Sequence, residues 1–206
     1  MIQMDTILKR YATRKINAML AEKPVFFVIM ENQRRCHRMK NYQWYSDRWG
    51  EPTRDDHMLF LLLTVGVFQA GLSWQAAAGK REVFERNFCG MDFRKVAAFF
   101  PEDIEEIAKD PEMIRNSRKI QAVVQNARAI VTLLEDYESF ADYLWDFVGG
   151  VPIVREYELA EEVPNTLPEA TTIAKDMKKR GFSFVGPVIT CMLLKAAGII
   201  QDRVME

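Results

Sequence analysis

The feature that most constrains the fold is a long uncharged run from Met58 to Gly79, which contains LFLLLTVGVFQAGLSW from Leu59 to Trp74. Its first two-thirds are apolar on every face, which is typical of a helix buried on all sides and not of an amphipathic surface helix. The apolar part is too short to cross a bilayer, which needs roughly 20 apolar residues. The run therefore predicts a core helix of a globular protein, with no membrane partner.

The end of this predicted helix has a different composition. Gln69, Gly71, Ser73 and Trp74 place an amide, a flexible point, a capping hydroxyl and a large indole close together. Such an end can line a ligand pocket, although Trp74 can equally be a core side chain and Gln69 can simply satisfy neighbouring backbone groups.

Composition limits the remaining classes. The chain has 206 residues, is 49% hydrophobic and carries a net charge of -1, which suits one globular domain with a sizeable core. Residues 1–50 carry a formal charge of +6 and the rest -7. This asymmetry permits an anionic partner near the N-terminal third, but charge runs are also common on solvated faces.

Cysteine and histidine content argues against a disulfide framework and against a metal site. Cys36, Cys89 and Cys191 are widely separated and odd in number, which favours a reducing, cytoplasmic location. The apolar run at residues 25–30 is too short and too far into the chain for a cleavable signal peptide. Only two histidines occur, so a tetrahedral metal site lacks ligands.

The N-terminal third divides into two segments. Residues 6–22 have apolar positions at helical spacing with Lys and Arg between them, which predicts a short basic helix within an N-terminal extension, residues 1–31. Residues 32–57 are rich in charge and aromatics and predict mostly loop. Aromatics interleaved with arginine are suited to base stacking and phosphate neutralisation.

From Lys80 to Ile200 the signals are helical almost throughout. Asp92 is positioned to cap one helix, and Pro101 to begin another. A further helix is predicted over residues 140–148, and residues 149–168 form the longest non-helical stretch. A buried stripe at helical spacing comprises Ile120, Val123, Val124, Ala127, Val131 and Leu134. No convincing strands are found, so the predicted class is all-α, with residues 32–206 as one domain.

The last motif, residues 176–198, predicts a helix, a tight turn from Gly181 to Gly186, and a second helix beginning at Pro187. The free N–H groups at the start of the second helix, with Lys178, Lys179 and Arg180 nearby, can hold a phosphate. A glycine-bounded turn between helices is also common as a purely structural element.

Taken together, these residues resemble the DNA-3-methyladenine glycosylase I family of the helix-hairpin-helix DNA glycosylase superfamily. The resemblance spans about Cys36 to Arg203 and rests on WGEP, FQAGLSW, KREVF, MIRNSRKIQAVVQNARAI, YLWDFV and KKRGFSFVGP. It implies a compact helical domain that flips an alkylated purine out of duplex DNA and hydrolyses its N-glycosidic bond, in base excision repair. No cofactor is expected, and the expected state is a monomer.

The resemblance also implies site residues. It places backbone phosphates at Lys178, Lys179, Arg180, Gly181 and Gly186. The implied base pocket comprises Trp44, Tyr45, Gly66, Phe68, Gln69 and Trp74.

The sequence departs from the family pattern at two sites. The family has a base-binding glutamate eight residues before the tryptophan of AGLSW, and that position is Gly66 here. The family's zinc is held by two Cys and two His. Cys36 matches one ligand, but Ser46 and Arg203 stand where histidines are expected, so we expect no metal.

Three functions remain open at this stage. The first is a monofunctional glycosylase for alkylated purines, with Gly66 enlarging the pocket. The second is a non-catalytic DNA- or lesion-binding descendant, and the third is a helical scaffold for a protein partner. Val188 stands where other branches of the superfamily carry a lysine, so Schiff-base lyase chemistry is not expected.

Overall fold

The computed structural model describes residues 41–205. The predicted extension at 1–31, its helix at 6–22, Cys36 and the first part of the 32–206 domain lie outside the described residues. Within the described part, no helix is both long and apolar enough to cross a membrane.

The described chain is predominantly helical, which confirms the predicted class. Short 3-10 turns at Cys89–Met91 (η1) and Ala160–Glu162 (η2) connect larger elements. The helices are α3 (Gln43–Arg48), α4 (Asp56–Gln69), α5 (Trp74–Ala78), α6 (Arg81–Asn87), α7 (Phe93–Ala97), α8 (Pro101–Lys109), α9 (Ser117–Leu133), α10 (Phe140–Asp146), α11 (Pro168–Lys179) and α12 (Pro187–Ala196).

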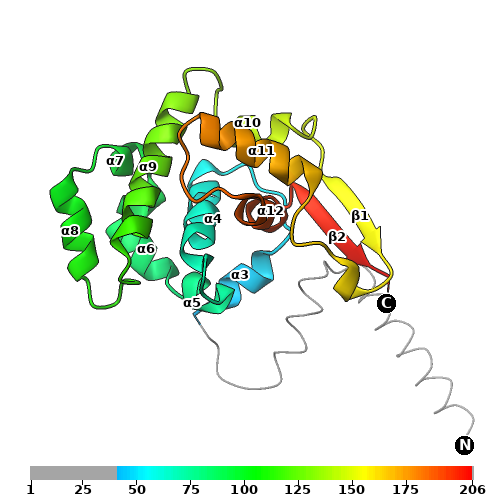
Figure 1. Ribbon diagram of the computed structural model, residues 1–206, viewed down its shortest axis with the longest axis horizontal. Helices are drawn as coiled ribbons and strands as arrows, with labels where there is room; N and C mark the ends of the chain where they lie inside the picture. Colours follow the sequence, from blue (N-terminus) through cyan, green and yellow to red (C-terminus); the bar gives the residue numbers. More distant parts are fainter. Residues whose placement is uncertain (1–40, 206) are drawn as a thin grey trace, which may run out of the picture.

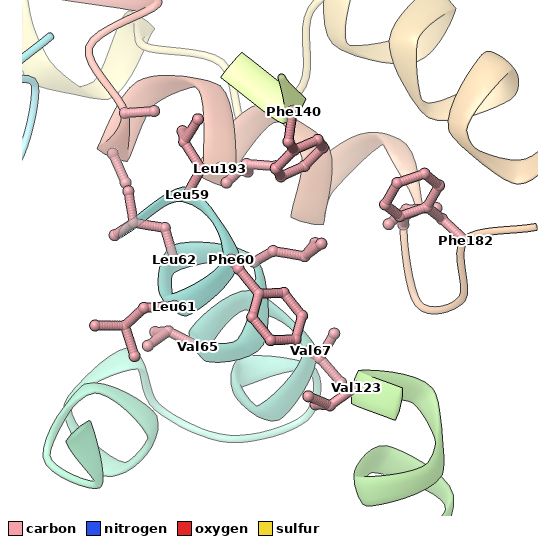
Figure 2. Close-up of a cluster of buried hydrophobic side chains, with 14 of the residues drawn as sticks. Leu59, Phe60, Leu61, Leu62, Val65, Val67, Val123, Phe140, Phe182 and Leu193 are labelled. Carbon is pink, nitrogen blue, oxygen red and sulfur yellow. The ribbon is translucent and has the colours of Figure 1, made fainter. Parts of the chain in front are cut away.

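Helix α4 is the central helix, as its uniform apolarity predicts. It runs through the middle of the molecule, with α6 to α9 on one side and α10 to α12 on the other (Figure 1). Every residue from Leu59 to Phe68 is buried. Figure 2 shows its side chains packed with Phe140 and Leu193 in one direction and Val123 in another. The hydrophobic core therefore surrounds this helix.

Helix starts follow the capping signals in the sequence. Asp92 accepts hydrogen bonds from the Arg94 and Lys95 amides at the start of α7, and Pro101 is the first residue of α8. In α9 the predicted stripe is buried from Ile120 to Ala127, but Val131 is 40% exposed.

Two sequence expectations are corrected by the fold. Residues 43–48, expected to be loop, form α3. Strands β1 (Ile153–Tyr157) and β2 (Ile200–Val204), which were not expected, pair in parallel with Ile153 opposite Ile200. The strands are short and far apart in the sequence, so each is specified by its partner and by packing more than by a local pattern.

Candidate functional site

A cavity of about 330 Å³ lies between the end of α4 and the α12–β2 segment. Its volume is within the range of about 300–1,000 Å³ that is usual for small-molecule sites. The lining residues are Trp49, Gly50, Gln69, Trp74, Ala160, Val163, Pro164, Asn165, Met192, Lys195, Ile200, Gln201 and Asp202. Its two indoles and its amide and charged groups would suit a planar, polar ligand.

An aromatic cluster fixes the two indoles. Tyr45 is buried and stacks against Trp74, with ring centroids 6.0 Å apart and an interplanar angle of 21°. Tyr42 meets Trp74 edge-on at 5.0 Å, and Tyr45 contacts Trp49 at 5.4 Å. Burial raises the pKa of Tyr45 above its usual value, so its hydroxyl stays protonated. Tyr45, predicted in the pocket, thus supports Trp74 and does not itself line the cavity.

The segment that follows Trp49 packs closely on the end of α12 and on β2. Gly198, just after α12, has a φ of 68°, and a Cβ at this position would collide with the backbone of residues 50–52. The Thr53 amide donates to the Ala197 carbonyl at 3.1 Å, and Gln201 donates to the Gly50 carbonyl at 3.2 Å. Glycine is required at 198 because both its conformation and this contact exclude a side chain.

Two other predicted pocket residues lie elsewhere. The Trp44 indole N–H donates to the Ala78 carbonyl at 2.9 Å, and the Arg81 guanidinium lies 4.8 Å from its ring centroid. Phe68 is fully buried and stacks on Phe84 at 4.8 Å. Neither side chain lines the cavity. Trp44 anchors α3 to α5, and Phe68 belongs to the core.

Gly66 also lies away from the lining residues. It is buried where α4 packs on α12, and a Cβ at this position would lie 3.0 Å from Ile189 Cγ2. The geometry therefore supports a close helix crossing at this glycine, in place of the enlarged pocket expected from the sequence.

A buried ion pair, which sequence reasoning missed, forms part of the cavity wall. Lys195 on α12 and Asp202 on β2 are 3% and 7% exposed, and Nζ lies 2.7 Å from Oδ2. Lys195 also donates to the Pro164 carbonyl at 2.8 Å. The only sequence signal is a single lysine within the apolar run CMLLKAAGII, and its partner depends on the unpredicted strand β2.

The segment after α4 is held by a lysine of α9. The Lys119 ammonium donates to the Phe68 and Ala70 carbonyls at 2.8 and 2.5 Å, satisfying acceptors at the helix end. Burial lowers the pKa of Lys119. Between this anchor and Trp74, Leu72 is 46% exposed. An apolar side chain is therefore presented to solvent next to the cavity residues Gln69 and Trp74.

The predicted helical hairpin is present, with α11 ending at Lys179 and α12 beginning at Pro187. Asn126 of α9 brackets the turn, because its amide donates to the Ser183 carbonyl and accepts from the Ser183 amide at 3.1 and 2.7 Å. Gln125 donates to the Gly181 carbonyl at 3.1 Å. The turn is thus fixed before any ligand binds.

The predicted phosphate-binding residues differ in their availability. Lys178 and Lys179 are exposed, and a Cβ on Gly186 would meet no atom within 4 Å. The Arg180 guanidinium is already engaged, because it pairs with Asp176 at 2.9 Å and with Asp136 at 2.8 Å. Arg180 therefore links α11 to the segment after α9, and its Nε and Nη1 already bind carboxylates.

The residues present do not fit the zinc site that the resemblance implies. Ser46 on α3 and Arg203 on β2 offer a hydroxyl and a cation where imidazole ligands would be required. Within residues 41–205, no group of three or more His, Cys, Asp or Glu side chains is arranged to hold a metal ion.

Comparisons with known proteins agree with this architecture. A family model described as methyladenine glycosylase matches residues 35–206. DNA-3-methyladenine glycosylase 1 of Escherichia coli K12 is 36% identical over 162 residues, which cover 79% of this chain and 87% of that protein. DNA-3-methyladenine glycosylase of Haemophilus influenzae is 31% identical over 163 residues, covering 79% and 88%.

Solved structures give the same result. A 3-methyladenine DNA glycosylase I variant in complex with 3-methyladenine superposes with a TM-score of 0.78 at 32% identity, covering 82% of this chain and 92% of that one. The Staphylococcus aureus enzyme, solved for its 3-methyladenine recognition, has a TM-score of 0.77 at 33% identity, covering 82% and 91%. The chain belongs to the methyladenine glycosylase family.

Proposed function

We propose that this protein is a monofunctional DNA glycosylase that hydrolytically excises alkylated purines, 3-methyladenine foremost, from duplex DNA, acting as a cytoplasmic monomer in base excision repair. The observation that carries the proposal is the cavity walled by Trp49 and Trp74, in a chain that is 36% identical to a DNA-3-methyladenine glycosylase. An alternative is a non-catalytic protein that binds DNA or its lesions.

Hydrolysis of this glycosidic bond needs little catalytic assistance from protein side chains. A purine alkylated at N3 is cationic, so its glycosidic bond is already weakened and water can displace the base once it is extruded. Indole faces attract a cationic ring by about 0.5–2 kcal/mol each. Trp49 and Trp74 would therefore favour the alkylated base over its neutral parent.

Contacts to DNA would come from two segments that are both hydrogen-bonded to side chains of α9. Lys119 fixes the segment carrying Leu72, and Asn126, seven residues later, fixes the hairpin. Seven residues of helix span about 10 Å. The hairpin supplies unpaired N–H groups at the start of α12 with Lys178 and Lys179, and Leu72 would enter the base stack as an apolar wedge.

The test measures free-base release from methylated duplex DNA, together with DNA affinity as a function of salt. The parent should release 3-methyladenine, and its affinity should fall steeply with salt because phosphate contacts release counterions. Leu72→Ala should reduce release at least tenfold, whereas Leu159→Ala, a leucine of similar exposure (49% against 46%), should leave it unchanged. Gly186→Val should weaken binding to all sequences alike.

Two results would count against this assignment. Tight, salt-sensitive DNA binding without base release would favour the non-catalytic alternative. Equal activity of the parent and Leu72→Ala would remove the wedge from the proposal.

A further inference from the structure

Two residues that line the cavity each carry a buried acceptor atom without a hydrogen-bond partner in the part of the chain that the structure describes. Asp202 Oδ1 and Gln69 Oε1 are each inaccessible to solvent and accept no hydrogen bond within residues 41–205. Both side chains line the same cavity, Gln69 from α4 and Asp202 from β2. Buried acceptors without donors are uncommon in folded proteins, and each calls for an explanation.

The groups around Asp202 orient its carboxylate, and Tyr157 of β1 lies near it, since burial and then this carboxylate raise the pKa of Tyr157. Lys195 binds Oδ2 at 2.7 Å and is itself anchored by the Pro164 carbonyl, so the carboxylate is oriented and its charge is balanced. Behind it, Arg155 of β1 pairs with Glu169 at 2.7 Å and makes no ion pair with Asp202. Arg155 Nε and Glu169 Oε2 are also buried without partners, but neither residue lines the cavity.

Stability alone does not account for a buried Lys–Asp pair in this wall. Removing two charges from water is costly, and well-packed apolar residues often replace such pairs without loss of stability. The arrangement is better explained by what it presents to the cavity. It places a carboxylate that Lys195 orients in the same cavity lining as the Gln69 amide and two indoles, which can stack on a planar ring.

We propose that Asp202 is a specificity-determining residue that accepts a hydrogen bond from the exocyclic amine of the bound purine, with Gln69 accepting from a second N–H donor. Lys195 is a positioning residue that holds Asp202. The preferred ligands are purines with a 6-amino group. Purines with a 6-oxo group are disfavoured because they place an acceptor against the carboxylate. This inference rests on the proposed function, since it takes the cavity to be the base site.

The test uses the full chain and two free bases, 3-methyladenine and 3-methylhypoxanthine, which carries an oxo group in place of the 6-amino group. Affinities are measured by calorimetry and by quenching of tryptophan fluorescence. The parent should bind the amino base at least tenfold more tightly than the oxo base. Asp202→Asn should bring this ratio close to one, because the amide can donate to the oxo group as well as accept from the amine.

Matched variants separate recognition from folding. Because Asp202→Asn leaves Lys195 without its counter-charge, the double variant Lys195→Gln/Asp202→Asn provides an uncharged pair and should show the same loss of preference. Glu169→Gln alters a carboxylate in the neighbouring ion pair outside the cavity and should keep the parent's ratio. Melting temperatures of all variants identify any that are unfolded.

The outcomes separate this inference from the proposed function. A parent that prefers the amino base through Asp202 but releases no base from DNA would support the inference and refute the enzyme activity. If the parent excises 3-methyladenine and neither Asp202 variant changes the preference for the amino base, the enzyme activity is supported and the inference is refuted. If the parent binds neither free base, or prefers the oxo base, the inference is overturned.

Discussion

Replacing Gly66 by glutamate should destabilise the protein strongly, because the position is a helix crossing and not a pocket wall. The new Cβ would lie 3.0 Å from Ile189 Cγ2, so this side chain would have to shift by a few tenths of an ångström. Overpacking of this kind costs about 1–3 kcal/mol. A buried carboxylate without a partner adds about 3–5 kcal/mol, and the better helix propensity returns less than about 1 kcal/mol.

The net loss is therefore about 3–8 kcal/mol. At about 2–4 °C per kcal/mol for a chain of this size, the melting temperature should fall by at least about 6 °C. Gly66→Ala is the matched control, since it makes the same contact without the charge, and it should lie within about 2 kcal/mol of the parent. Adding Ile189→Leu, which removes Cγ2, should recover most of that difference.

The assay pairs urea unfolding with release of 3-methyladenine from methylated DNA. A Gly66→Glu variant that melts within about 2 °C of the parent would refute the crossing argument. If that variant also releases more base than the parent, the position faces a solvated pocket, and a carboxylate there contributes to recognition.

Three further predictions concern stability and composition. Lys119→Met should cost about 2–4 kcal/mol in urea unfolding, because two hydrogen bonds from a charged donor are lost and the relief of its desolvation offsets only part of them. Arg86 donates to Asp110 and holds the pKa of that carboxyl well below its usual range. The interaction of Arg86 with Asp110 stabilises the protein fully above the carboxyl's unfolded-state pKa of about 3.9. This stabilisation is lost as the pH falls through the lower pKa of the folded state. Asp110→Asn should accordingly flatten the decline of melting temperature below about pH 4. Elemental analysis should find no stoichiometric zinc, and a ratio near one would overturn that expectation.

Much of the helical core was predictable because its signals are local. The apolar run of α4, the Asp92 cap and the prolines at the starts of α8 and α12 depend on neighbouring residues alone. Strands β1 and β2 were missed because their pairing joins segments more than 40 residues apart, and neither is long enough to be recognised by itself.

The candidate site was only partly predictable for the same reason. Gln69 at the end of α4 and Trp74 at the start of α5 were predicted as pocket residues and line the cavity, whereas Trp49 and Asp202 reach it through long-range packing. The sequence shows the charge of Arg180 but not its carboxylate partners, Asp136 and Asp176, which the fold brings next to it. Gly66 was placed in the pocket by sequence reasoning because the sequence does not show that Ile189 lies beside it.

The two-stranded sheet has a consequence for how the site responds to a ligand. Two strands alone are marginally stable, so β2 depends on β1 and on α12 for its order. Because Gln201 and Asp202 belong to both β2 and the cavity wall, local opening of this strand would dismantle the wall. Amide hydrogen exchange in residues 200–204 should therefore slow when the cavity is occupied, while exchange in α9 stays constant. Ligand binding in the cavity would thus be measured as slower amide hydrogen exchange in β2.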